Sequence, residues 1–450
     1  MRLQHIALAC VLAFNAACAT AGVSAEEAAR LKSDLTPLGG EKAGNKDGSI
    51  PAWTGGYTTA IPGDKPGERR GDPFKDEKPL FSITGKNVDQ YADKLTEGQK
   101  ALLNKYPEYR IDVYKTHRTA AAPQWVYDNA SKNATKGRLD GYVPKDVYGG
   151  TPFPIPKSGV EVMWNHLLRW RGTNWAVSAT QYLFTADGRT VMTTDGEGER
   201  QMPYYFEGGS IADVEKRGDM YWRIRLVNIG PPIRAGDALV GGPGMDSKND
   251  AAWVYLTGQR RVRKLPNPCC DTPTPATAGN MMFDEVEVFI GRPDRFDWKI
   301  LGKQEMFVPY NGNRVLQPKT DAEVLGKAFI KPDYMRWELH RMWVVEANLR
   351  DGQRHQAPRS RYYCDEDTWH CVLADRWDAK GQLWRTLYQM NFVAPDIPAT
   401  AAGAFGMVDL LSGQAHVADL ATSKAAQFPV RPRIPDSVFS PEAMAGESVR

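Results

Sequence analysis

The sequence predicts an α+β protein whose main feature is a large antiparallel β-sheet. The chain of 450 residues contains 13 Trp, 18 Tyr and 15 Phe together with 41 Gly and 31 Pro. Aromatic residues favour strands, whereas glycine and proline favour turns. From residue 174 onward, apolar residues recur at every second position in segments that short turns separate, which is typical of antiparallel strands. Clear helical spacing is confined to the chain before that point.

Two stretches of the N-terminal part carry helix signals. Thr96-Glu-Gly-Gln99 and Ser158-Gly-Val-Glu161 have the pattern of a capping box, in which two side chains satisfy the free backbone N–H groups at a helix start. Apolar residues follow each box at helical spacing. We therefore expect helices within residues 88–106 and 158–170, and we expect both to pack against the sheet.

The alternating segments define the expected strands. The pattern is clearest in residues 220–227 and 339–349, where apolar side chains fall on one side. Further strands are expected at residues 252–256, 260–265, 298–309, 361–364, 371–377 and 383–392. The last three form a meander with turns rich in aspartate, and this succession through short turns favours antiparallel pairing.

The N-terminus predicts export. Residues 1–25 read as a secretory signal peptide, because the apolar run from Ile6 to Phe14 has the length of such a region and is too short to span a bilayer. Small residues allow cleavage after Ala21 or Ala25. The second position is preferred because Glu26-Glu27 would then open a helix. The protein is thus expected in the periplasm.

The rest of the chain is expected to form one decorated domain. Residues 26–80 are rich in Gly, Pro, Lys and Asp and predict a segment that wraps over a folded body. Residues 81–392 are expected to form that folded body. Residues 393–450 are rich in Ala and Pro and are expected to pack on the body as a C-terminal extension.

Export changes the meaning of the four cysteines that follow the signal. In an oxidising compartment an even number suggests disulfides, and four cysteines allow three pairings. A turn centred on Asp367-Thr368 places Cys364 opposite Cys371, at a separation that a disulfide can span. Cys269 and Cys270 would then form a vicinal bond or remain free. A metal site is the competing interpretation, but no Cys-x-x-Cys pair or neighbouring histidine supports it.

No motif for catalysis or cofactor binding is found. Phosphate-binding glycine loops, the dinucleotide fingerprint, the nucleophile elbow and the His-Glu-x-x-His zinc motif are all absent from the sequence. The acidic cluster Asp365-Glu-Asp367 is expected to be solvated at a turn. A net charge of +3 does not indicate a nucleic-acid-binding protein, which would carry a marked excess of basic residues. The expectation is a protein without catalytic residues, metal or cofactor, and without a nucleic-acid partner.

Four blocks in order resemble a known bacterial periplasmic family. They are EKAGNKDGSIPAWTGG (41–56), LTGQRRVRKLP (256–266), RPDRFDWKILGKQEMFVPYN (292–311) and YYCDEDTWHCVLADRWDAKGQLWR (362–385). Together they resemble the family called domain of unknown function 1329, which is similar to the lipoprotein-sorting proteins LolA and LolB and to the sigma-E regulator RseB. This resemblance implies a curved antiparallel half-barrel with helices covering its concave face and acyl chains bound inside. It implies no catalytic residue.

A half-barrel of this kind would place alternate side chains inside a cavity. The candidate pocket residues are Trp222, Ile224, Leu226, Trp253, Tyr255, Trp343, Val345, Trp384, Tyr388, Met390 and Phe392. The alternative is that these residues simply pack against the two helices and leave no cavity.

The resulting hypothesis is a periplasmic carrier for a hydrophobic molecule such as a lipid, an acyl chain or an apolar nutrient. A membrane transporter or an outer-membrane channel is the expected partner. The alternative is an interaction or regulatory module of the envelope with a filled half-barrel. A hydrolase with an unrecognised site is a third hypothesis.

Overall fold

A computed structural model describes residues 22–64 and 67–447. Its helices are α1 (Ala25–Ala29), α2 (Glu97–Lys105), α3 (Gln124–Lys136), α4 (Gly159–Leu167), α5 (Ile211–Glu215), α6 (Asp321–Val324) and α7 (Pro441–Glu447). Its strands are β1 (Phe81–Ile83), β2 (Ile111–Val113), β3 (Arg138–Asp140), β4 (Val143–Lys145), β5 (Asn174–Phe184), β6 (Thr190–Gln201), β7 (Arg223–Gly230), β8 (Ala238–Gly242), β9 (Ala251–Leu256), β10 (Arg261–Lys264), β11 (Phe296–Pro309), β12 (Trp337–Leu349), β13 (Arg359–Asp365), β14 (Cys371–Trp377), β15 (Leu383–Ala394), β16 (Ala399–Asp409) and β17 (Ala415–Leu420). The expected α+β class is confirmed.

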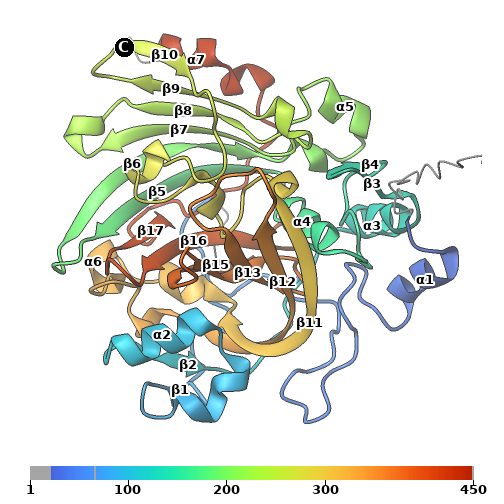
Figure 1. Cartoon of the computed structure of the whole chain (residues 1–450). Coiled ribbons are helices and arrows are strands. Elements are labelled where there is room, and N and C mark those ends of the chain that lie inside the picture. Colours follow the sequence, from blue (N-terminus) through green and yellow to red (C-terminus); the bar gives the residue numbers. More distant parts are fainter. Residues whose placement is uncertain (1–21, 65–66, 448–450) are drawn as a thin grey trace, which may run out of the picture.

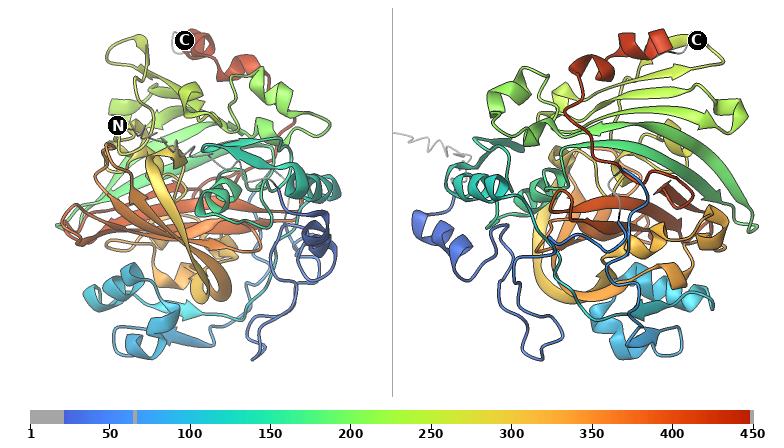
Figure 2. Two further views of the ribbon diagram at one scale, coloured as in Figure 1. Left: turned by 45° about the vertical axis from the view of Figure 1, so that its right-hand side comes forward. Right: turned by 180° about the vertical axis from the view of Figure 1, so that it is seen from behind.

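Most strands belong to one curved sheet, as Figures 1 and 2 show. It has 15 strands among the described residues, in the order β1-β2-β12-β13-β14-β15-β16-β17-β5-β6-β7-β8-β9-β10, with β11 pairing β12. All pairs are antiparallel except a single parallel contact between β2 and β12. The chain therefore builds two parts of the sheet, β5–β10 and β11–β17, which join where β17 pairs with β5.

Residues 393–450 were expected to pack on the body as an extension, and the structure corrects this. Strands β16 and β17 lie in the middle of the sheet, between β15 and β5. Every residue of β16 is buried, so the strand is covered on both faces, and such strands need not alternate. Small residues fit there: a side chain at Gly406 would collide with the carbonyl oxygen of His416. The Ala-rich composition thus marks a buried strand.

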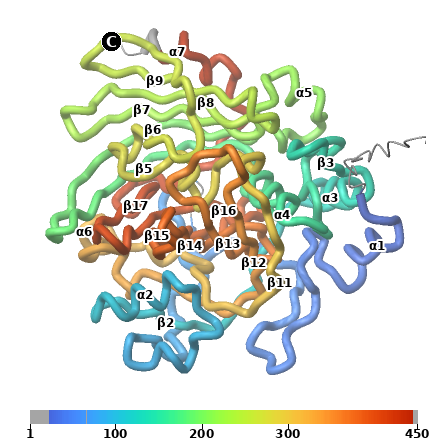
Figure 3. The backbone as a smooth tube through the Cα atoms, in the orientation of Figure 1, coloured from blue at the N-terminus to red at the C-terminus, as the bar shows by residue number. Residues whose placement is uncertain are grey.

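The N-terminal segment, drawn in blue in Figure 3, runs along distant parts of the chain. Between α1, with the short 3₁₀ turn that continues it, and β1 it contains no further helix or strand in its described part, residues 22–64 and 67–80. Side chains tie it to distant elements. The Trp53 indole donates to the Ala120 carbonyl at 2.9 Å, and Arg70 forms an ion pair with Asp396 at 2.9 Å.

Both expected helical stretches form. α4 starts at the capping box of Ser158 and Glu161. Residues 88–106 form a 3₁₀ helix, Val88–Lys94, followed by α2, which the capping box of Thr96 and Gln99 opens. Among the described residues, no helix combines the length and the apolar character required to cross a membrane. Residues 1–21 of the expected signal peptide lie outside the described residues, and Ala25, after which cleavage is expected, is the first residue of α1.

The two faces of the sheet are covered by different elements. On β14, Asp375 accepts a hydrogen bond from the Gly98 amide of α2 at 3.0 Å, whereas its neighbour Arg376 donates to Asp284 at 3.0 Å. Adjacent strand residues point to opposite faces, so α2 and Asp284 lie on opposite sides of the sheet. We call the side of Asp284 the inner face. It is covered by α4 and by residues 265–295, which we call the capping segment.

Candidate functional site

A cavity opens between the inner face of β7–β9 and the capping segment. Its volume is about 100 Å³, and about 900 Å³ when the open mouth is included. Its walls are mostly apolar, and the charged lining residues are Arg200, Asp250, Arg292 and Asp419. The lining residues from the sheet include Trp222, Ile224, Leu226, Leu239, Ala251, Ala252 and Phe405, and those from the capping segment include Pro268, Cys269, Ala276, Phe283, Val286 and Ile290.

The strand register explains why this wall is apolar. Ile224 lies opposite Gly241, and Leu226 lies opposite Leu239. In the next pair, Gly241 lies opposite Ala252. Because partners in a register share a face, these residues form continuous apolar rows across three strands. Glycine and alanine in the rows leave the space that the cavity occupies.

Two buried carboxylates fix the capping segment to the sheet. Arg376 pairs with Asp284, and Arg385 pairs with Glu285 at 2.7 Å. Burial by itself raises the pKa of Asp284, but Arg376 and His355 hold that pKa well below its usual range. Removal of Arg376 would leave Asp284 with His355 alone, and removal of Arg385 would leave Glu285 with Arg376 at 3.8 Å. Weakening the pairing of a buried carboxylate in this way is destabilising. The segment is therefore a fixed wall of the cavity.

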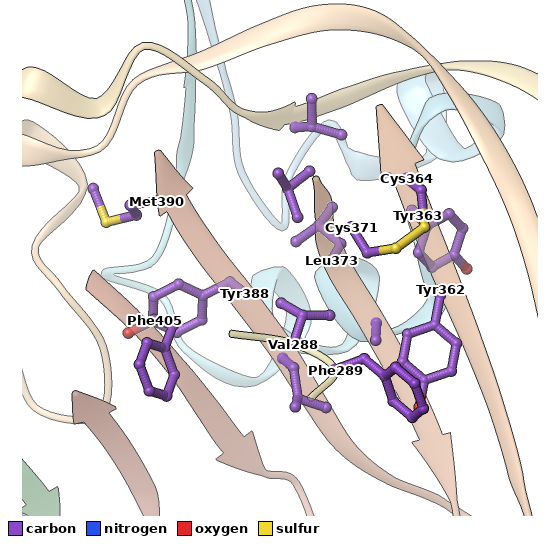
Figure 4. Packing of buried hydrophobic residues seen from close by; sticks show 14 of the residues in the cluster. Val288, Phe289, Tyr362, Tyr363, Cys364, Cys371, Leu373, Tyr388, Met390 and Phe405 are labelled. Carbon is purple, nitrogen blue, oxygen red and sulfur yellow. A yellow bond between two sulfur atoms is a disulfide. The ribbon is translucent and has the colours of Figure 1, made fainter. Parts of the chain in front are cut away.

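Further along the sheet, apolar side chains of the capping segment pack against the sheet (Figure 4). Phe289 packs against Tyr362 with ring centroids 5.3 Å apart, and Val288 is fully buried. The His166 ring of α4 accepts from the Cys371 amide at 2.9 Å. Thus the β12–β15 part of the inner face is filled, whereas the β7–β9 part remains hollow.

Three of the expected pocket residues line the cavity: Trp222, Ile224 and Leu226. Trp343 and Val345 lie on the filled part of the inner face, because Val345 pairs with Tyr362 and Trp343 with Cys364. Phe392 lines a separate, much smaller cavity of about 10 Å³ together with Arg171 and Glu287.

The remaining candidates point to the outer face, and their placement in the pocket is a wrong prediction. Trp253 and Tyr255 alternate with the cavity residue Ala252, and Tyr255 belongs to a buried cluster with Met444 of α7. Trp384, Tyr388 and Met390 alternate with the inner-face residue Arg385. The sequence showed alternation but not which of two apolar sides faces inward.

Both cysteine pairs are bonded. Cys364 and Cys371 lie opposite each other in the β13–β14 register and form a disulfide with Cα atoms 3.6 Å apart, as the turn predicted. Cys269 and Cys270 form the vicinal disulfide that was one of two open possibilities. Cys269 lines the cavity, so this bond is part of its wall.

The acidic cluster at the β13–β14 turn is buried, which corrects the expectation of a solvated turn. Asp365, Glu366 and Asp367 are all at most 2% exposed. Arg118 forms two hydrogen bonds with the Asp367 carboxylate, at 2.6 and 2.7 Å, and Arg341 pairs with Glu366 at 2.6 Å. These arginines also donate to backbone carbonyls of the wrapping segment. The cluster therefore fastens that segment to the sheet.

The same cluster contains a possible metal-ligand geometry. Ligand atoms of His340, Asp365 and Asp367 lie within 4.8 Å of one another. Burial, together with the neighbouring Asp367, raises the pKa of Asp365 to about 6. However, the Arg118 guanidinium already occupies both oxygens of Asp367, and a cation would compete with that charge. The arrangement functions as a buried ion-pair network.

No sequence pattern predicted that the capping segment covers the inner face of the sheet. It joins β10 to β11 and contains only short 3₁₀ turns, among them Pro275–Thr277 and Phe283–Glu285. Loops of this length without regular structure are uncommon in compact domains and are often functional. That length, together with its Phe, Val and Ile residues, was the available signal.

Comparisons with known proteins agree with the resemblance seen in the sequence. A family model described as "Protein of unknown function (DUF1329)" matches residues 82–445. The "Uncharacterized protein PA3922" of Pseudomonas aeruginosa is 36% identical over 444 residues, covering 96% of this chain and 95% of that one.

Solved structures show more distant similarity. A DUF1329 family protein from Desulfovibrio piger matches 61% of this chain and 92% of its own, with 13% identity and a TM-score of 0.42. An outer membrane lipoprotein-sorting protein domain from Vibrio parahaemolyticus, so described, matches 64% of this chain and 98% of its own, with 12% identity and a TM-score of 0.44. The family match and the full-length relative together show that the chain belongs to the DUF1329 family of proteins of unknown function.

Proposed function

We propose that the protein is a non-catalytic periplasmic carrier that binds a hydrophobic ligand in the cavity between β7–β9 and the capping segment. The apolar cavity carries this proposal. A concave site with apolar walls and a few polar groups is the usual form of a small-molecule site. Burial of a ligand there would contribute about 0.8 kcal/mol for each methylene removed from water.

The dimensions of the cavity limit which ligands can enter it. An apolar cavity of roughly 150 Å³ holds one benzene molecule, and this one measures about 100 Å³. This space is smaller than the cavity that holds benzene, so it accepts only a short segment of a longer ligand. The rest of a longer ligand would lie in the open mouth, so the proposed ligand is held by one end.

The disulfides support export. Two bonded pairs, one of them in the cavity wall, suit an oxidising compartment such as the periplasm. A carrier in that compartment would exchange its ligand with a membrane transporter or an outer-membrane channel.

A variant that fills the cavity tests the proposal. Ala252→Trp adds an indole on the inner face, and an indole is larger than the space available. Val262→Trp is the matched control, because Val262 pairs with Tyr255 on the outer face of β10. Native mass spectrometry and lipid extraction of protein purified from periplasm should detect a bound apolar molecule in the wild type and in Val262→Trp, but not in Ala252→Trp. Absence of any ligand from the wild type, with no binding of apolar probes, would overturn the proposal.

A second candidate function rests on the filled part of the inner face. Because the capping segment already covers β12–β15 (Figure 4), the protein could act as an envelope interaction module without a ligand. That function predicts that Ala252→Trp retains all its partners in pull-downs from envelope extracts. The carrier function predicts that ligand-dependent partners are lost.

A further inference from the structure

Five charged side chains meet beside the cavity, and their charges do not balance. Arg169, Arg171 and Arg200 surround Glu287 and Asp419. Arg169 and Arg171 both form ion pairs with Glu287. Arg200 forms an ion pair with Asp419 and approaches Glu287 at 3.5 Å. All five side chains are at most 8% exposed. Three cations therefore share two anions, which leaves one excess positive charge in a buried place.

Neighbouring groups do not remove this excess. His370 accepts a hydrogen bond from Arg169 at 2.9 Å, so that ring nitrogen carries no proton. Burial and the nearby arginines hold the pKa of His166 and that of His370 well below their usual range. The histidines are therefore neutral. Arg70, which lies over the Trp175 ring at 5.4 Å, is already paired with Asp396.

Two hydrogen-bond donors of the charged cluster also lack acceptors. The Nε–H groups of Arg171 and Arg200 are buried and have no hydrogen-bond partner. Arg200 lines the main cavity together with Asp419. Arg171 lines the adjoining small cavity, which shares Arg200 with the main one. A buried charge without a full complement of partners is costly, and an incoming anion would remove that cost.

From this arrangement we infer that the cavity binds an amphiphile with a single acidic head group, of the carboxylate class. The head group lies beside Arg200 and Arg171, where it forms charge-assisted hydrogen bonds. The alkyl part lies along Trp222, Ile224 and Leu226. This inference rests on the proposed carrier function and specifies its ligand class. One bound carboxylate brings the buried cluster to zero net charge.

Paired ligands test the inference on the full-length mature protein after removal of lipid. Decanoate and decanol differ only in the head group. Each is titrated against the neutral fluorescent probe N-phenyl-1-naphthylamine at pH 6, where decanoate is ionised and Asp250 in the cavity wall, whose pKa burial raises to about 7, keeps its proton. We expect decanoate to bind at least ten-fold more tightly than decanol, and acetate to bind far more weakly than decanoate. Equal binding of decanoate and decanol would overturn the acidic head group but leave the carrier function standing. Acetate as tight as decanoate would show a site for free anions and also overturn the inference. If neither decanoate nor decanol binds, the carrier function falls as well.

One substitution removes the excess charge and leaves no carboxylate unpaired. In Arg171→Met, Glu287 keeps Arg169 and Asp419 keeps Arg200, so the variant is expected to fold. The preference for decanoate over decanol should fall at least ten-fold. Arg261→Met, on exposed β10, is the matched control and should keep the wild-type preference. A folded Arg171→Met protein with the wild-type preference would refute the role of the arginine cluster.

Discussion

Removal of the Cys364–Cys371 disulfide measures how much a single covalent link contributes to this large sheet. The two cysteines lie seven positions apart in the chain. In the chain-entropy treatment, a ring of this size contributes about 2.5 kcal/mol to the free energy of unfolding. Both side chains are fully buried, so replacement by alanine also removes packing worth roughly 1 kcal/mol. We expect the Cys364→Ala/Cys371→Ala protein to lose about 3–4 kcal/mol.

Urea denaturation at pH 7, followed by tryptophan fluorescence, measures this loss. The hairpin itself should survive, because the Trp369 amide still donates to the Asp365 carbonyl at 2.9 Å. The double variant Cys269→Ala/Cys270→Ala is the internal comparison, since the same treatment assigns its minimal ring only about 1 kcal/mol. A loss below 1 kcal/mol for the hairpin variant, or a larger loss for the vicinal one, would refute the ring-size reasoning.

Three further predictions concern processing, pH and packing. Signal cleavage should leave Gly22 as the first residue of the mature protein. The residues that follow are part of the fold, because the Val23 amide donates to the Ala134 carbonyl and Ser24 caps α1. N-terminal sequencing that finds Glu26 first would contradict this prediction. Burial raises the pKa of Asp250 to about 7, so the folded protein holds a proton that the unfolded chain releases near pH 4, and stability is lost as the pH rises through this range. Relative to Asp250→Asn, the free energy of unfolding should fall by about 1.4 kcal/mol per pH unit between about pH 4 and 7 in urea titrations; a constant difference would be the wrong result. Gly98→Ala should destabilise the protein by roughly 2 kcal/mol, because the new methyl group would collide with the Asp375 carboxylate. This loss outweighs the preference of helices for alanine, which is about 1 kcal/mol. Equal or higher stability in the same assay would contradict the close approach.

The two parts of the inner face differ in how the capping segment packs on them. Over β12–β15 the capping segment is anchored by buried ion pairs and aromatic packing, which hold it rigidly. Over β7–β9 the same segment spans small residues and leaves a cavity. Rigid support beside a hollow site keeps the site open without a ligand, and this pre-organisation lowers the cost of binding.

Alternation predicted the inward side of β7 correctly because its two sides differ in polarity. Trp222, Ile224 and Leu226 alternate with Arg223 and Arg225. Only one of these sides can face an apolar cavity.

Alternation could not choose the inward side of β9. Residues 251–256 are apolar at every position, because α7 covers the outer side while the cavity lies on the inner side. β16 is a similar case: both faces of the strand are buried, so its composition resembles that of a tail.

By itself, the sequence determined the antiparallel sheet, the capped helices, the Cys364–Cys371 bond and the family. These features depend on contacts between residues close in the chain, or on blocks of residues that can be recognised directly. Only the tertiary structure decided that Arg200 meets Glu287 and Asp419, which are 87 and 219 positions away, and that Arg118 meets Asp367. Such contacts depend on how the sheet curves and on where the capping segment crosses it, because the charge balance of a buried site is set by the residues that folding brings together.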